Sequence, residues 1–152
     1  MLIERAAQQS EACRRLDAIP GIGPLTATAL IAAIGNGGAF RKGREFAAWV
    51  GLVPREHSTG GKQKLLGISK RGNSYLRKLF VQGARAVLKY RDKQCSGLRH
   101  WLAELSLRSH YNVVGVALAN KLARMAWAVL ASGTAYRPPV RADMTGLQMT
   151  PV

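Results

Sequence analysis

Two adjacent hydroxyl residues, Ser58 and Thr59, lie in the most basic stretch of this sequence and are followed at once by two glycines. Only Glu56 supplies a carboxylate between Gly51 and Lys78. A hydroxyl on a glycine-flexible segment among cations suits a phosphate group, as at nucleic-acid backbones. We therefore expect a basic loop over residues 51–78 whose phosphate-binding cations are Arg55, Lys62, Lys64, Lys70, Arg71, Arg77 and Lys78.

The hydroxyl could play either of two parts. It could donate a hydrogen bond to a phosphate oxygen, or it could attack phosphorus and form a covalent ester. Ser-Thr-Gly-Gly is also ordinary turn sequence, so the residues alone leave these alternatives open. A Walker-type loop is excluded because Gly61-Lys62 is followed by Gln63. His57 is adjacent to Ser58, but neighbours in an extended segment point to opposite sides, so adjacency does not make it a base.

The charge of the chain points to a polyanionic partner. The 152 residues contain 23 Lys and Arg against 8 Asp and Glu, a formal net charge of +15. Most of these cations fall between Arg41 and Lys93. Clustering of this kind favours nucleic acid over a uniformly solubilised surface, with acidic membrane lipid as a weaker competitor.

The sequence offers little support for a metal site or a membrane span. Cys13 and Cys95 are isolated, and three histidines do not make a zinc constellation, so we expect no metal ligands and a reducing compartment. Residues 113–130 are apolar but include Asn120, Lys121 and Arg124, which lipid would penalise. We interpret this segment as a core helix and expect no membrane partner.

The hydrophobic pattern predicts a mainly α, compact helical domain over residues 1–133, with a flexible tail over 134–152. Strand signals are nearly absent, apart from one short β-hairpin near residues 62–68. Asn73 is suited to cap the helix that follows the basic loop, and Asn112 to cap the last one. The predicted helices cover residues 4–17, 25–34, 43–50, 74–91, 98–107 and 113–131.

The first two predicted helices form a hairpin over residues 12–35. Pro24 suits the first turn of the second helix and Gly35 its C-terminal cap. The turn Gly21-Ile22-Gly23 looks like a helix-hairpin-helix motif, in which backbone N–H groups approach a DNA phosphate without reading bases. A plain helical hairpin is the alternative.

Three motifs together resemble the C-terminal domain of the insertion-sequence-110-type transposases. They are IPGIGPLTATALIAAIG, then FAAWVGLVPREHSTGGKQKLLGISKRGNSYLRKLF, then NKLARMAWAVLASG, in the order of that family. The resemblance implies a bacterial DNA recombinase of mobile elements, cytoplasmic and associated with the nucleoid, guided by a structured RNA. It further implies a serine nucleophile at Ser58, with Thr59 as runner-up because the loop varies by about a residue.

The resemblance also implies an acidic, RNase H-like domain that is not in this sequence. We expect Mg²⁺ only in that domain and no cofactor in this chain, and we expect the chain to need that domain or a second copy as partner. A second hypothesis is a non-enzymatic DNA or RNA binder that uses the helical hairpin and the basic helix. A third is an assembly module that dimerises through its C-terminal helices.

Overall fold

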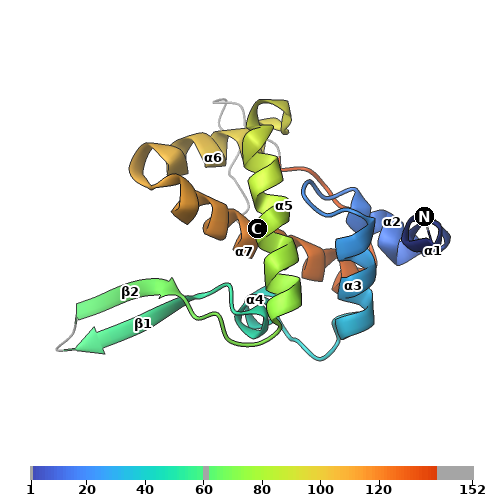
Figure 1. The fold of residues 1–152 in the computed structure, drawn as a ribbon, viewed down its shortest axis with the longest axis horizontal. Helices are drawn as coiled ribbons and strands as arrows, with labels where there is room; N and C mark the ends of the chain where they lie inside the picture. The colour runs from blue at the N-terminus through green and yellow to red at the C-terminus, as the bar shows by residue number, and fades with distance from the viewer. Residues whose placement is uncertain (1, 60–61, 140–152) are drawn as a thin grey trace.

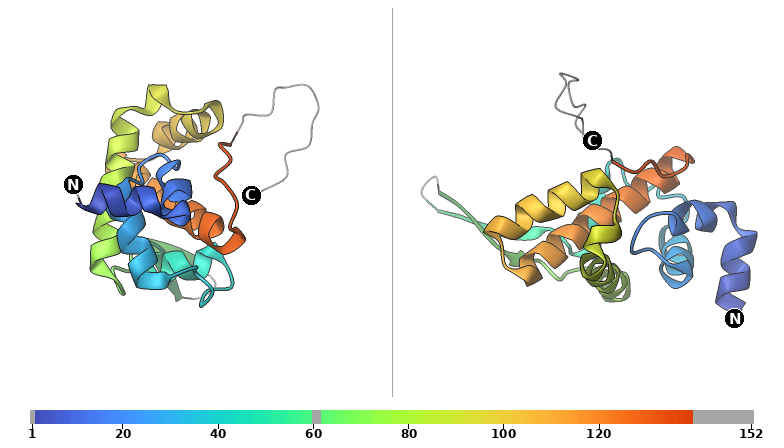
Figure 2. Two further views of the ribbon diagram at one scale, coloured as in Figure 1. Left: turned by 90° about the vertical axis from the view of Figure 1, so that its right-hand side faces the viewer. Right: turned by 90° about the horizontal axis from the view of Figure 1, so that it is seen from above.

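The computed structural model describes residues 2–59 and 62–139 and confirms a mainly helical protein (Figure 1). Among the described residues, one two-stranded antiparallel hairpin extends away from the helices (Figures 1 and 2). The described helices are α1 (Leu2–Gln9), α2 (Glu11–Asp17), α3 (Pro24–Ile34), α4 (Gly43–Val50), α5 (Ser74–Lys89), α6 (Ser96–Arg108) and α7 (Tyr111–Ser132), with a 3₁₀ turn η1 (Arg91–Lys93) and strands β1 (Pro54–Thr59) and β2 (Lys62–Ile68).

Helix α7 is the central element of the core. It packs against α5, α4, α2 and α6, and it buries side chains along one side of its whole length, among them Leu118, Leu122 and Ala126. Its length and apolar character would suffice for a membrane span, but half of its most apolar stretch is buried inside the protein. The packing supports the interpretation of residues 113–130 as a core helix.

Helix α5 follows the predicted pattern closely. The Asn73 side chain accepts a hydrogen bond from the Leu76 N–H, as expected of the N-cap. Leu76, Phe80 and Val87 are buried on the face toward α7. The helix ends at Lys89 rather than near residue 91, because the chain tightens there into η1. Because this face of α5 is packed against the core, the helix also fixes the position of residues 69–73, which connect it to β2.

The N-terminal hairpin forms, with one correction. The helix predicted over residues 4–17 is broken into α1 and α2 at Ser10, whose hydroxyl accepts from the Cys13 N–H and starts a new helix. Pro24 begins α3 and Gly35, at φ 59°, caps its end, as predicted. The segment has a strong helix propensity. A serine side chain can nevertheless cap a new helix, and this hydrogen bond competes with continuation of the first helix.

One prediction about the C-terminal helices is wrong in detail. The cap of α7 is His110, whose Nδ1 accepts from the Asn112 N–H, so Asn112 lies inside the helix. In α6, Leu98 and Leu102 are the fully buried residues, whereas Trp101 and Leu105 are half-buried at the edge of the core.

Residues 134–139 of the predicted tail lie against the body of the protein. The Pro139 carbonyl accepts a hydrogen bond from the Gly97 N–H at 3.2 Å, at the start of α6. The Tyr136 ring packs at the edge of the core, and its hydroxyl is buried without a hydrogen-bond partner among the described residues. Residues 140–152 lie outside the described part of the chain.

Replacing Tyr136 by phenylalanine should stabilise the protein by about 1 kcal/mol near neutral pH, because a buried hydroxyl without a partner is removed. Burial, with a smaller contribution from Cys95, raises the pKa of Tyr136 to about 12. The folded chain therefore keeps the phenol proton where the unfolded chain, with a pKa of about 10, loses it. The native protein should lose stability between pH 10 and pH 12, and Tyr136→Phe should lose less.

Urea denaturation of both proteins at pH 8 and pH 11 measures this difference. Tyr75→Phe, at an exposed tyrosine, is the matched control and should behave as the unmutated chain. Equal losses in the Tyr136→Phe variant and the unmutated chain would show that this phenol does not contribute.

Candidate nucleic-acid interface

The hydroxyl pair lies on a strand, not in the loop that the sequence suggested. Ser58 and Thr59 are the last two residues of β1, and the register places Ser58 opposite Gln63 and Thr59 opposite Lys62. Residues 60 and 61 lie outside the described part of the chain. The predicted short hairpin near residues 62–68 is only its second strand, and its partner is the segment that carries Ser58.

The register separates the two hydroxyl positions. Directly opposite residues, and residues two apart on one strand, share a face of a hairpin. Thr59 therefore shares a face with His57 and with two cation positions, Lys62 and Lys64. Ser58 shares the other face with Glu56, Gln63 and Leu65. Ser58 and Thr59 thus stand on opposite faces of the hairpin by register, which makes the choice between them testable.

The basic residues predicted to surround Ser58 fall into two groups. Arg55, Lys62 and Lys64 lie on the hairpin strands with it. Lys70 and Arg71 follow β2, and Arg77 and Lys78 lie near the start of α5. Since a strand rises about 3.3 Å per residue, Ser58 stands roughly 17 Å from Val53, where the hairpin meets the helices. The second group of cations is too far along the chain to surround the hydroxyl.

The base of the hairpin is held by backbone contacts between residues 51–53 and 69–72. The Ser69 N–H donates to the Val53 carbonyl at 2.9 Å, and the Lys70 N–H donates to the Gly51 carbonyl at 3.2 Å. Gly51 ends α4 at φ 86°, and a Cβ there would overlap the Arg71 backbone. We call these two segments, residues 51–53 and 69–72, the hairpin root.

A third contact ties the root to the core. Leu52 is buried, and its carbonyl accepts from the Asn120 side chain of α7 at 3.0 Å. The sequence indicates Asn120 only as a residue unsuited to a membrane span. A lone amide within an apolar helix is a signal that could have suggested a buried hydrogen bond of this kind. The hairpin is therefore positioned by the helical core.

Arg77, predicted to bind phosphate, is engaged inside the protein. Its Nη1 donates to the Val50 carbonyl at 3.1 Å and to the Arg71 carbonyl at 3.4 Å, joining the end of α4 to the root. The neighbouring Lys78 is exposed. The two adjacent cations thus differ, the first half-buried against backbone oxygens and the second at the surface.

Arg77→Ala should destabilise the protein by about 1.5–3 kcal/mol, because hydrogen bonds from a charged donor to partly buried carbonyls are lost. Lys78→Ala should stay within about 0.5 kcal/mol of the unmutated chain, as exposed substitutions usually do. Urea denaturation of the two variants checks the contrast. Equal effects would mean that the Arg77 contacts do not hold the root.

In the turn at residues 19–24, some residues pack against the core and others are open to solvent. Ile22 is buried, as expected of an anchor under the turn. Gly21, at φ 83°, approaches the backbone of Gly83 in α5, so this glycine serves packing. Gly23 has open space where a Cβ would lie, just ahead of α3. A small hollow beside Pro24 is lined by Glu4 and Asp17 as well as Arg14, so the charge near this helix start is mixed.

No metal site is visible in the part of the chain that the structure describes. No three histidine, cysteine or carboxylate side chains come together there as ligands would. Cys13 and Cys95 are both free thiols.

Comparison with known proteins decides the family. Residues 13–98 match the sequence profile of the transposase IS116/IS110/IS902 family, a range that runs from the N-terminal hairpin through the β-hairpin to α6. The chain belongs to the IS116/IS110/IS902 transposase family. The resemblance inferred from the three motifs is thereby confirmed.

Several curated transposases are similar over most of this chain. A probable family 20 transposase of Pseudomonas aeruginosa is 54% identical over 82% of the chain and 37% of its own length. The transposase of insertion sequence element IS1328 from Yersinia enterocolitica is 48% identical over 83% of the chain and 38% of its own length. The transposase of insertion sequence element IS1111A from Coxiella burnetii is 44% identical over 89% of the chain and 37% of its own length. This transposase chain thus spans a little over a third of the length of these curated relatives.

Proposed function

We propose that this chain is the DNA-binding part of an insertion-sequence transposase and that its hairpin carries the hydroxyl nucleophile for DNA strand exchange. The observation that supports the proposal most is the hairpin itself. It carries two adjacent hydroxyl residues among cation positions and extends from the helical body, while its root is fixed by Asn120, Arg77 and close backbone contacts (Figure 1). A rigid root with an extended arm suits insertion into a nucleic-acid groove.

In the proposed reaction the Ser58 hydroxyl oxygen attacks a DNA phosphorus and forms a serine phosphodiester. The bond from phosphorus to one deoxyribose oxygen breaks, and that oxygen takes up a proton as it leaves. The hydroxyl of an incoming strand then attacks the same phosphorus, which restores the serine and joins the new strand. Arg55, Lys62 and Lys64 are the hairpin cations proposed to stabilise the charge on the phosphate oxygens. Because Lys62 and Lys64 share a face with Thr59 and not with Ser58, they suit attack by Thr59 better, which is a reason to test both hydroxyls.

The rest of the proposed machinery lies outside this chain. The acidic, Mg²⁺-binding domain and a structured guide RNA are the proposed partners, and a second copy of the chain would supply the second strand-transfer site. The proposed place of action is the bacterial cytoplasm, at the nucleoid. The root cations Lys70 and Arg71, together with Lys78 of α5 and the turn at Gly21, Ile22 and Gly23, would hold DNA phosphates beside the hairpin.

The test is recombination by the chain reconstituted with an acidic partner domain, guide RNA and donor and target DNA. Ser58→Ala should reduce strand exchange by about a thousandfold or more, since loss of a nucleophile removes the chemical step. A covalent protein–DNA adduct on a denaturing gel should disappear with it. Ser74→Ala, at an exposed hydroxyl in the first turn of α5, is the matched control and should leave both readouts unchanged.

Thr59→Ala distinguishes the two hydroxyl positions. If Thr59 is the nucleophile, the losses fall on that variant and Ser58→Ala stays active. Recombination at the unmutated rate by both variants would overturn the proposal of a hydroxyl nucleophile on this hairpin.

A non-enzymatic nucleic-acid binder is the second candidate, favoured by the open Gly23 at the start of α3 and the exposed cations of α5. It predicts that Lys70→Ala weakens binding while Ser58→Ala changes nothing, and that no adduct forms under any condition.

A further inference from the structure

The exposed face of α5 carries a continuous row of polar residues. Tyr75, Lys78, Gln82, Arg85 and Lys89 follow one another at helical spacing, and all five are exposed. Helix α5 contains no aspartate or glutamate. No ion pair joins a cation of this row to a carboxylate among the described residues. The row therefore presents uncompensated positive charge along the whole helix.

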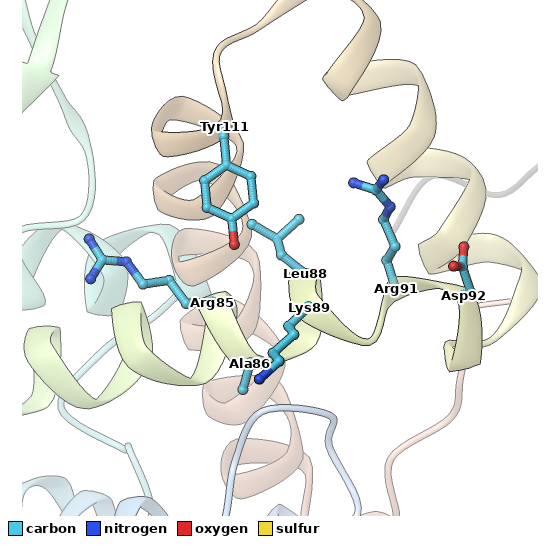
Figure 3. A pocket seen from close by; sticks show the side chains of 7 residues that line it. All are labelled: Arg85, Ala86, Leu88, Lys89, Arg91, Asp92 and Tyr111. Carbon is cyan, nitrogen blue, oxygen red and sulfur yellow. The ribbon is translucent and has the colours of Figure 1, made fainter.

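The row ends in an open hollow between the last turns of α5 and the start of α7. The hollow measures about 530 Å³ and is lined by Arg85, Lys89, Arg91 and Tyr111, with Asp92 as its one carboxylate. Figure 3 shows the Tyr111 ring reaching over α5, with the Arg85 and Arg91 side chains on either side of it. Three cations and an aromatic ring thus line one concavity, with Arg85 and Arg91 beside the ring and Lys89 pointing away from it (Figure 3).

Aromatic rings accompany the cations at both ends of the row. Tyr75 is 53% exposed at its start, and Tyr90 and Tyr111 are each 50% exposed at its end. The ammonium groups of Lys89 and Lys93 lie 5.6 Å and 5.4 Å from the centre of the Tyr90 ring. Half-exposed rings beside solvent-facing cations match the surfaces on which single-stranded nucleic acids bind, where bases stack and phosphates pair.

Local helix stability explains only part of this arrangement. Lys89 and Arg91 lie at the C-terminal end of α5, where positive charge is favourable to the helix dipole. Arg85 and Lys78 lie further from that end, and the dipole effect fades within the last turn. The helix dipole therefore does not account for Lys78 and Arg85.

We propose that the exposed face of α5 and the hollow at its end bind a single-stranded nucleic-acid segment. Its phosphates follow the row from Lys78 to Arg91, and bases stack on Tyr90 and Tyr111. From Tyr75 to Lys89 the helix rises about 21 Å, roughly the length of six nucleotides at 3.4 Å each. This surface rests on the proposed function only in taking nucleic acid as partner, and it needs no nucleophile on the hairpin.

Fluorescence anisotropy of the 152-residue chain with a 12-nucleotide single-stranded DNA, the same sequence as RNA, and the DNA duplex tests the proposal across a salt series. Replacing Arg85, Lys89 and Arg91 together by alanine should weaken single-strand binding about tenfold or more. It should also make the log–log salt slope shallower by about two, since about three phosphate contacts are lost. The DNA and RNA arms identify which strand is preferred.

Two controls distinguish binding at this surface from a general effect of the net charge of the protein. Replacing Arg5, Arg14 and Arg137, which are exposed on other elements, by alanine removes the same charge and should change single-strand affinity less than threefold. Tyr111→Phe should bind as the unmutated chain, whereas Tyr111→Leu should lose about tenfold because stacking is lost. Thermal unfolding of each variant shows that it is folded.

Equal weakening by the two triple variants, or no weakening by either, would overturn the proposal. So would an unchanged affinity in Tyr111→Leu, or equal losses for single strand and duplex. These outcomes are independent of the nucleophile, because Ser58→Ala should leave single-strand binding unchanged even if strand exchange is abolished.

Discussion

Gly72→Ala should destabilise this protein by about 3 kcal/mol or more and lower its unfolding midpoint by roughly 6–12 °C. Gly72 lies in the hairpin root at φ 92°, a backbone conformation that side chains with a Cβ disfavour. A Cβ there would also overlap the carbonyl oxygen of Trp49 in α4. Backbone cannot move aside as a flexible side chain can, so the segment before α5 must detach from α4.

The matched control is Gly133→Ala. Gly133 ends α7 at φ 65°, also in the left-handed region, but no atom lies within 4 Å of its added Cβ. That variant should show the conformational cost alone, about 1–2 kcal/mol. Thermal and urea unfolding of both variants measure the difference. Equal destabilisation of the two variants would mean that the overlap with the Trp49 carbonyl adds nothing to the cost of the substitution.

The same substitution also bears on the proposed function. If the root directs the hairpin, Gly72→Ala should abolish strand exchange in the reconstituted system at a temperature where the chain is still folded, whereas Gly133→Ala should retain it. Retention of activity by the Gly72 variant would show that the hairpin acts without a fixed root.

Gly83→Ala and Gly115→Ala should change stability in opposite directions, although both place alanine in the middle of a helix. Alanine is favoured over glycine there by about 0.5–1 kcal/mol. At Gly115 in α7 the added Cβ would meet the Leu88 Cδ1 at 3.6 Å, an ordinary contact, so this variant should gain about that amount.

At Gly83 the added Cβ would overlap the Gly21 carbonyl oxygen and approach its carbonyl carbon to 3.1 Å. The turn between α2 and α3 must then shift away from α5, and overpacking of this kind costs about 1–3 kcal/mol. After the propensity gain is subtracted, we expect a net loss of about 1 kcal/mol. Urea denaturation of the two variants gives the sign directly, and stabilisation by both would mean that the turn adjusts freely.

If the turn holds DNA phosphate, Gly83→Ala should also weaken duplex binding, because the loops on either side of Ile22 would be displaced. Unchanged duplex affinity in a folded Gly83→Ala variant would count against a nucleic-acid role for Gly21–Gly23. The contact therefore links a stability measurement to the role proposed for the turn.

The sequence by itself determined the features that depend on neighbouring residues. The cap at Asn73, the start of α3 at Pro24 and the buried face of α5 each follow from interactions within one turn, so periodicity and capping predicted them. The family followed from motifs in order along the chain, and the comparisons confirm it. The charge of +15 is likewise a sum that needs no structure.

Only the tertiary structure decided what depends on residues distant in sequence. It placed Ser58 on a strand, because pairing with Gln63 and not local propensity sets that register. It assigned Arg77 to the Val50 carbonyl and Asn120 to the Leu52 carbonyl, 27 and 68 residues away. An arginine that binds a nucleic-acid phosphate at the surface cannot be told, from the sequence, from one that binds a buried backbone oxygen. They differ only in which backbone the fold brings within hydrogen-bond distance, and that is set by the packing of α4, α5 and α7.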